Sequence, residues 1–250
     1  PSRLLSGIQS PLKNIGPAEL DWVIVRENTE GEYSGAGGRV HPKLPQEVGI
    51  DVSVFTRDGI ERVMRYAFEL ALTRPKKQLT LVTKSNAQRH GMVLWDEVFE
   101  KLKHDYPGIT TDRMLVDAIT TRMVLQPQSL DTIVATNLHA DILSDLAATL
   151  SGSLGIGPTA NINPERTFPS MFEPIHGSAF DLVGKDLANP LGAFWSCVMM
   201  LEHLQENMGA SLLMSAIEEV CQEGRHLPKD LGGNSCTGEV TTEVCAALKK

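Results

Sequence analysis

The sequence predicts an α/β fold with at least partly parallel strand pairing. Short apolar runs rich in β-formers, typical of buried strands, occur at residues 20–26, 79–83, 114–116 and 132–135. Apolar residues at helical spacing predict helices at residues 58–74, 92–102 and 138–150. Strands that alternate with helices indicate a sheet covered by helices. No G-x-G-x-x-G follows any of these strands, so a Rossmann fold is not predicted.

The other segments have different patterns. Residues 30–45 are rich in glycine and proline and predict a loop or projecting arm. Residues 48–54 alternate apolar and polar side chains, which indicates a half-exposed strand. A second part of the chain begins near Gly152, and residues 194–204 and 212–221 are predicted helices.

Composition excludes several classes of function. The chain has 250 residues, 42% of them hydrophobic, which is enough for the core of one or two domains. A net charge of −8 argues against a nucleic-acid partner, and no apolar run is long enough for a membrane span. The four cysteines form no C-x-x-C pair, which favours reduced thiols in a cytoplasmic protein. The first residues resemble neither a signal peptide nor a natural start, so an interrupted sequence is expected.

The strongest local signal is a pair of carboxylates directly after a buried strand. Asp141 and Asp145 are four residues apart, so on a helix both side chains share one face. Two carboxylates at this edge of a sheet suit Mg²⁺ or Mn²⁺. Stabilisation of the helix dipole by acidic residues is the alternative. His139, two residues before Asp141, is interpreted as a packing or supporting residue rather than a ligand.

Other polar side chains lie at predicted strand ends. Lys84 suits proton transfer, Arg26 can bind a carboxylate through two hydrogen bonds, and Tyr33 can donate a proton. Asp117 follows another short strand. Each of these residues also has an ordinary structural interpretation, such as a solvated lysine or a strand-end aspartate.

Together, the motifs resemble the β-decarboxylating dehydrogenases, which include isocitrate, 3-isopropylmalate, tartrate and D-malate dehydrogenases. The resemblance covers VIVRENTEGEYSG (23–35), TKSN (83–86), the strand before Asp117, ATNLHADILSDL (135–146) and FEPIHGSAFDLVGKDLANP (172–190), in family order. The tracts at 53–71 and 161–179 are most similar to the D-malate and tartrate branch.

The resemblance implies an isocitrate/isopropylmalate dehydrogenase-like fold of two domains that lacks its N-terminal part. Residues 6–152 would form the central substrate, metal and dimerisation domain, with an arm at about 35–50 that resembles the family's dimer clasp. Residues 153–250, with 1–5, would belong to the NAD-binding domain.

The resemblance also implies catalytic roles. Arg26 would bind the substrate carboxylate, and Tyr33 would protonate the enol left by decarboxylation. Lys84 would help to remove the hydroxyl proton, assisted by Asp117. The metal would be held by Asp117, Asp141 and Asp145. In this family Lys84 and Asp117 serve the neighbouring subunit's site, which implies a homodimer.

The cofactors implied are NAD, Mg²⁺ or Mn²⁺, and K⁺. Asn86 would lie near the nicotinamide. The adenosine side of NAD would be lined by His176, Gly177, Ser178, Ala179, Asp181 and Asn189. Asp181 favours NAD over NADP, because a carboxylate accepts a hydrogen bond from a ribose hydroxyl and repels a 2′-phosphate.

The predicted reaction is oxidative decarboxylation of a small 2-hydroxy acid such as D-malate or tartrate. Ser10 falls where isopropylmalate dehydrogenases carry a second substrate-binding arginine, and its short hydroxyl favours a small or hydroxylated substituent. Two departures from the family pattern stand near the site: His139-Ala140 replaces the usual Phe-Gly, and Phe180 replaces a proline. The alternatives are a 3-isopropylmalate dehydrogenase and a non-catalytic or inactive truncated relative.

Overall fold

The computed structural model describes all residues, 1–250. Contacts divide the chain into two compact units, residues 22–144 and residues 1–21 together with 145–250. These units are defined by contacts alone, and the domain assignment made from the resemblance, with borders at residues 6 and 152, stays a prediction.

The unit of residues 22–144 is built on four parallel strands. Their order across the sheet is β2 (Asp21–Arg26), β7 (Thr132–Ala135), β5 (Gln78–Thr83) and β6 (Thr110–Leu115). Val134 of the fully buried β7 lies between Val25 of β2 and Leu81 of β5. The predicted α/β class with parallel pairing is confirmed.

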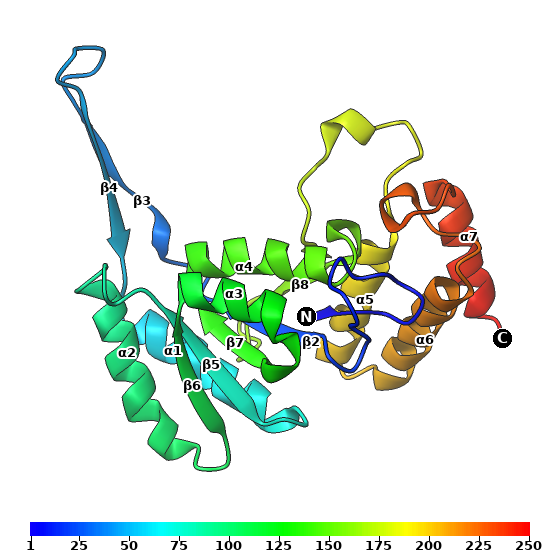
Figure 1. Cartoon of the computed structure of the whole chain (residues 1–250), viewed down its shortest axis with the longest axis horizontal. Helices are drawn as coiled ribbons and strands as arrows, with labels where there is room; N and C mark the ends of the chain where they lie inside the picture. Colours follow the sequence, from blue (N-terminus) through cyan, green and yellow to red (C-terminus); the bar gives the residue numbers. More distant parts are fainter. The chain divides into compact units, whose positions relative to one another are not determined.

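One face of this sheet is covered by α1 (Arg57–Thr73) and α2 (Gly91–Leu102) (Figure 1). The α1 helix begins where the Thr56 hydroxyl accepts a hydrogen bond from the Gly59 amide at 3.0 Å. Phe68 of α1 stacks on Phe99 of α2 with ring centroids 5.4 Å apart. The apolar residues at helical spacing that predicted these helices therefore form the main core.

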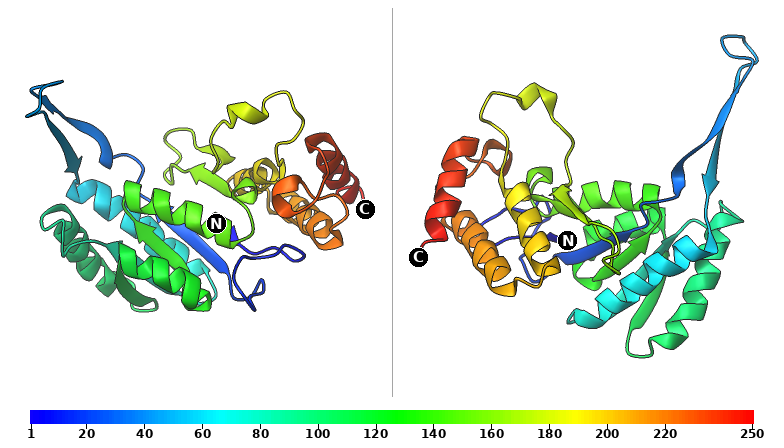
Figure 2. Two further views of the ribbon diagram at one scale, coloured as in Figure 1. Left: turned by 45° about the horizontal axis from the view of Figure 1, so that its top comes forward. Right: turned by 180° about the vertical axis from the view of Figure 1, so that it is seen from behind.

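The opposite face carries α3 (Val116–Leu125) and α4 (Asn137–Leu150) (Figure 2). The predicted strand at residues 114–116 extends too far, because β6 ends at Leu115 and α3 begins directly after it. The helix α3 was not predicted. Only Ile119 and Met123 of its residues are buried, so its apolar periodicity is weak.

The hairpin of β3 (Gly31–Val40) and β4 (Val48–Val54) projects from this unit (Figure 1). The projecting arm is confirmed, but the interpretation of residues 30–45 as a loop is wrong for β3. Glycines that normally mark loops pair here with β4, after an irregularity between Gly31 and Ala36. β4 is also exposed along its whole length, rather than half-exposed as predicted.

The second unit contains less β-sheet than the first. Its strands are β1 (Ser2–Arg3) and an antiparallel pair, β8 (Pro158–Asn161) with β9 (Met171–Pro174). Its helices are α5 (Leu191–His203), α6 (Asn207–Glu223) and α7 (Thr237–Ala247). The two helices predicted here are confirmed as parts of α5 and α6, while α7 was not predicted. Across the chain, no helix combines the length and apolarity needed to cross a membrane.

Short 3-10 turns complete the chain. They are η1 (Lys103–Asp105), η2 (Pro127–Ser129), η3 (Leu154–Ile156), η4 (Phe180–Leu182) and η5 (Lys229–Leu231). Gly192 at the start of α5 lies so close to η3 that a Cβ there would stand 2.7 Å from the Gly155 carbonyl oxygen. Gly155 and Gly157 therefore belong to a tight turn.

Candidate active site

Polar side chains follow all four strands of the parallel sheet at the same edge. Arg26 is the last residue of β2, and Lys84 follows β5. Asp117 lies in the first turn of α3 after β6, and Asn137 begins α4 after β7. Because parallel strands point the same way, their carboxyl ends meet at one edge, where open α/β sheets bind ligands.

Arg26 is held by two residues of α4. Its Nε and Nη2 atoms both donate to the Asn137 side-chain oxygen, at 2.9 and 2.6 Å. Its Nη1 donates to Asp141 Oδ1 at 2.7 Å, which forms an ion pair. Asn137 is buried, with 4% exposure, and its amide nitrogen donates to the Glu30 carbonyl at 3.2 Å. The guanidinium is therefore fixed by the first two turns of α4.

Tyr33 lies on the other side of the same carboxylate. Its hydroxyl donates to Asp141 Oδ2 at 3.2 Å, and its ring centroid is 5.6 Å from the Arg26 guanidinium carbon. The negative charge of Asp141 is the main cause that raises the pKa of the Tyr33 hydroxyl. Tyr33 is 56% exposed, and its hydroxyl stays protonated at neutral pH with the proton directed at Asp141.

Lys84 and Asp117 form the second pair of the edge. Lys84 Nζ lies 2.6 Å from Asp117 Oδ1, and this hydrogen bond is the main cause that lowers the pKa of the carboxyl. Asp117 is exposed, so the pair is open to solvent. The structure therefore brings together the lysine and the aspartate that the resemblance implies act together.

Both burial and charged neighbours affect the pKa of His139. Burial lowers the pKa of its imidazole, with an opposing effect of Glu32 and a further lowering effect of Lys84. Its Nδ1 atom is buried and has no hydrogen-bond partner. The interpretation of His139 as a packing residue stays a prediction.

The acidic residues between Arg26 and Tyr33 have structural roles. Glu27 is buried and accepts from the Thr29 and Glu30 amides at 2.9 to 3.0 Å. Glu30 accepts from the Thr56 amide at the start of α1. Glu32 accepts from the Leu138 amide at the start of α4, at 3.3 Å. These three carboxylates tie the loop to two helices and so place the arginine and the tyrosine.

Two of these functions were not predicted from the sequence. Asn137 and Glu32 both lie in motifs shared with the family, but the sequence pattern indicates no role for either of them. The signal that could have identified Asn137 is its position: it follows β7 directly, and β7 pairs with the strand that ends in Arg26.

The predicted metal ligands are distributed over two places. Asp141 and Asp145 both belong to α4, one helical turn apart, and two carboxylates are a suitable donor set for a hard cation. Within one chain no group of three acidic, histidine or cysteine side chains comes together. Asp117 therefore forms no such group with the α4 pair within one chain. The metal assignment stays a prediction.

The predicted NAD-binding segment has two different halves. His176 is half-buried, while residues 177–181 are exposed and a Cβ at Gly177 would meet open space. Asn189, at the other end, donates to Asp230 at 2.9 Å, and its oxygen accepts from the Leu191 amide at 2.9 Å. Its side chain is thus occupied within the chain, whereas the exposed half can receive a ligand.

Ser10 and Asn86 remain predictions. The Ser10 hydroxyl donates to the Leu150 carbonyl at 2.6 Å and accepts from the Leu12 amide at 3.1 Å. Its proton is therefore already used by the backbone of its own unit. Asn86 is exposed in the turn between β5 and α2, next to Lys84.

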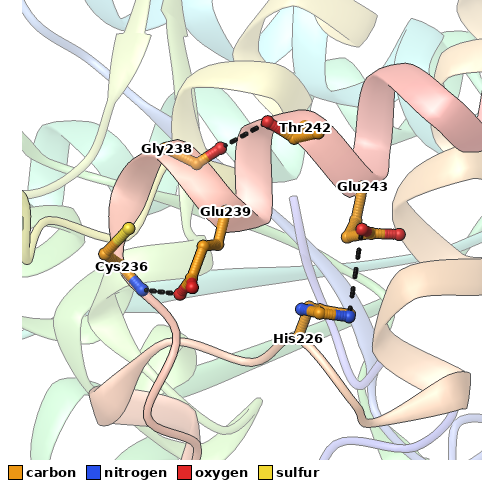
Figure 3. Close-up of a pocket in the computed structure, with 6 residues that line it drawn as sticks. All are labelled: His226, Cys236, Gly238, Glu239, Thr242 and Glu243. Atoms are coloured by element: carbon orange, nitrogen blue, oxygen red, sulfur yellow. Dashed lines mark hydrogen bonds and ion pairs between the residues drawn. The ribbon is translucent and has the colours of Figure 1, made fainter.

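A shallow depression of about 410 Å³ lies elsewhere, beside the start of α7 (Figure 3). It is lined by His226, Cys236, Gly238, Glu239, Thr242 and Glu243. A hydrogen bond with Asp186 is the main cause that raises the pKa of the Cys236 thiol, so a reactive thiolate is disfavoured. The depression contains none of the predicted site residues.

Comparison with known proteins identifies the family of the chain. The family model described as isocitrate/isopropylmalate dehydrogenase matches residues 1–247. A probable tartrate dehydrogenase/decarboxylase of Agrobacterium vitis is 63% identical over 99% of the chain and 69% of its own length. The D-malate dehydrogenase (decarboxylating) of Escherichia coli K12 is 47% identical over 99% of the chain and 70% of its own length.

A solved structure gives the same answer for the fold. The isocitrate dehydrogenase of Methylococcus capsulatus superposes with a TM-score of 0.91 and 37% identity, covering 100% of this chain and 72% of the other. The chain belongs to the isocitrate/isopropylmalate dehydrogenase family.

Proposed function

We propose that this protein oxidises and decarboxylates a malate-like 2-hydroxy acid, with D-malate and tartrate as the leading substrates. The observation that carries the proposal is the cluster of Arg26, Tyr33 and Asp141 at the carboxyl edge of the sheet, with the Lys84–Asp117 pair at the same edge. Relatives named tartrate dehydrogenase/decarboxylase and D-malate dehydrogenase, 63% and 47% identical, support this substrate class.

The side chains suit the two chemical steps. Loss of the hydroxyl proton and of a hydride from C2 reduces NAD to NADH and leaves a 2-keto acid with a carboxylate on C3. Lys84 and Asp117, contributed by a second copy of the chain, would help to remove the hydroxyl proton. Release of CO₂ then leaves an enol, and its C3 takes a proton. Tyr33 is suited to donate it, because its hydroxyl is protonated, exposed and held beside Arg26 by Asp141.

Arg26 supplies the charge that binds the substrate. Its guanidinium is a fork of N–H donors that matches a carboxylate, and it is fixed in place by Asn137 and Asp141. A dianionic malate-like acid offers two carboxylates, one of which Arg26 would bind.

Asp141 and Asp145 would hold Mg²⁺ or Mn²⁺, with Asp117 of a second copy as a further ligand. When bound, such a cation polarises the substrate hydroxyl and the carbonyl formed from it. The proposal includes K⁺ as a second, supporting cation. Removal of divalent metal with a chelator should abolish activity, and added Mg²⁺ or Mn²⁺ should restore it.

The nicotinamide cofactor is proposed to be NAD. Asp181 is exposed in the segment that would receive the adenosine, and its carboxylate would repel a 2′-phosphate. Asn86 would approach the nicotinamide. A kcat/KM for NADP equal to that for NAD would contradict this assignment.

A homodimer is proposed through the arm. Val48, Ile50 and Val52 alternate along β4, so their side chains form one stripe, and each is 48 to 49% exposed. An apolar stripe on a projecting strand is costly in water, and a second copy of the chain would cover it. Light scattering should give a dimer for the protein and a smaller species for Ile50→Lys. A monomeric wild type would contradict the proposal.

A cytoplasmic location is part of the proposal, because all four cysteines are free. The runner-up activity is oxidation of 3-isopropylmalate, and the runner-up of another class is a non-catalytic relative. The presence of Arg26, Tyr33, Lys84 and Asp141 in contact with suitable partners favours a catalytic protein.

The proposal is tested with Tyr33→Phe, which removes only the donated proton. The variant should lose about 10²- to 10⁴-fold in kcat, as expected for loss of a general acid, while its binding of NAD is unchanged. The matched control is Tyr66→Phe, a change of the same kind in a tyrosine of α1 outside the site. Equal losses in the two variants, or no loss in Tyr33→Phe, would contradict the assigned role.

A further inference from the structure

The Arg26 guanidinium has two edges that can bind a carboxylate through paired N–H groups. One edge is formed by Nε and Nη2, and the other by Nη1 and Nη2. The first edge is occupied completely, because Nε and Nη2 converge on the single Asn137 oxygen at 2.9 and 2.6 Å. The Nη1–Nη2 edge keeps one N–H on each nitrogen for a ligand, because Nη1 donates its other N–H to Asp141 Oδ1 at 2.7 Å.

Asn137 is itself fixed in one orientation. Its amide nitrogen donates to the Glu30 carbonyl at 3.2 Å, so the amide oxygen is the atom that faces Arg26. The residue is 4% exposed, and its backbone begins the α4 helix that also carries Asp141. The buried, fixed Asn137 side chain therefore sets the orientation of the partly exposed Arg26 guanidinium.

The choice of an amide has a chemical consequence. Asp141 already places one carboxylate on Arg26. An aspartate at position 137 would supply a second negative charge and would compete with an anionic ligand. The neutral Asn137 oxygen holds the Arg26 guanidinium without competing with an anionic ligand for its charge.

We propose that Asn137 is a positioning residue that locks the Nε–Nη2 edge of Arg26 and so presents the Nη1–Nη2 edge to a substrate carboxylate. The inference deepens the proposed function and rests on it for the identity of the substrate. The position of the guanidinium itself can be tested without any reaction.

The first measurement is the NMR signal of the Arg26 Nε–Hε group, assigned by its loss in Arg26→Lys. Asn137→Ala should lose or broaden this signal, whereas Asn137→Asp should keep it, since the carboxylate retains an acceptor. Aspartate is also favoured in the first turn of a helix, so this variant should fold.

Arg65 provides an internal reference in the same spectrum. Its Nε and Nη2 converge on Glu61 Oε1 at 3.1 and 2.6 Å, which is the same arrangement on α1. Its Hε signal should persist in both Asn137 variants and weaken in Glu61→Ala. An Arg26 signal that is unchanged in Asn137→Ala would overturn the inference.

The second measurement is steady-state kinetics with D-malate. Asn137→Ala should raise KM about tenfold, the equivalent of about one charge-assisted hydrogen bond, with a smaller change in kcat. Asn137→Asp should raise KM although the Arg26 signal is kept. Glu61→Ala should leave KM unchanged. In the Arg26→Lys background the Asn137→Ala change should have little further effect, which a merely structural role would not produce.

The possible results distinguish the inference about Asn137 from the proposed function. An active wild type whose KM is unchanged in Asn137→Ala overturns the inference and leaves the proposed function intact. A wild type inactive on every 2-hydroxy acid contradicts the proposed function, and the NMR comparison then decides the role of Asn137 alone.

Discussion

Gly31 is the residue whose replacement should reveal most about how the site is assembled. It lies between Arg26 and Tyr33 and has a φ of +86°, a value that favours glycine. A Cβ at this position would stand 3.3 Å from Phe55 Cε1 and 3.6 Å from the Asn137 Cβ. Gly31→Ala therefore strains the backbone at the point where the loop turns toward the start of α4.

The magnitude follows from these two terms. A left-handed backbone costs an L-residue about 1–2 kcal/mol, and the contact with Phe55 is tight but involves a side chain that can shift slightly. A loss of about 1–2 kcal/mol in the free energy of unfolding corresponds to a fall of about 2–8 °C in Tm for a chain of this size. The Tyr33 hydroxyl should also move from Asp141, so kcat/KM with D-malate should fall.

Gly38→Ala is the matched control. Gly38 belongs to the same hairpin, has no left-handed backbone, and a Cβ there would meet nothing within 4 Å. It should keep the wild-type Tm or raise it slightly, because alanine restricts the unfolded chain. Thermal unfolding and initial rates should be measured for both variants. Identical Tm and kcat/KM values in Gly31→Ala and Gly38→Ala would refute the reasoning.

Three further predictions concern stability and reactivity. Arg74→Met should lower the free energy of unfolding by about 3–5 kcal/mol, because it removes the cation from a buried ion pair. The Asp131 carboxylate of this pair is 1% exposed and lies 2.5 Å from the arginine. A loss below about 1 kcal/mol in denaturant unfolding would contradict this expectation. Burial raises the pKa of Glu202 above its ordinary value of 4.5, so the stability it contributes is fully present below that value and lost as pH rises through the folded pKa. Glu202→Gln should therefore raise Tm at pH 7 more than at pH 4, and an equal gain at both would be inconsistent. Burial raises the pKa of the Cys221 thiol to about 12, so iodoacetamide should label the exposed Cys245 at pH 8 and spare Cys221 in mass spectra of the folded protein.

The parts of the fold that could be predicted are those whose side-chain pattern reports burial directly. Strand β7 is buried at every residue and α1 has a clear apolar face, so both were identified within a residue or two. The helix α3 and the strand β3 were not. α3 buries two residues only, and β3 contains glycines whose strand geometry depends on pairing with β4. In both cases the element depends on contacts with residues outside its own segment.

The residues of the site could likewise be predicted only where a local pattern identifies them. Charged residues at strand ends could be selected from the sequence, and the sheet order then placed Arg26 beside α4 and Lys84 beside Asp117. The role of Asn137 could not be predicted, because it depends on the orientation of one amide between Arg26 and the Glu30 carbonyl. Such an orientation is set by tertiary contacts that no local pattern encodes.

The central claim is tested most directly by the substrate preference of the purified protein. NADH formation and CO₂ release should be measured with D-malate, tartrate, 3-isopropylmalate and isocitrate, in the presence of NAD and Mg²⁺ or Mn²⁺. The account predicts the highest kcat/KM for D-malate or tartrate, with CO₂ released as NADH forms. A clear preference for 3-isopropylmalate or isocitrate, or no NADH from any of the four acids, would contradict it.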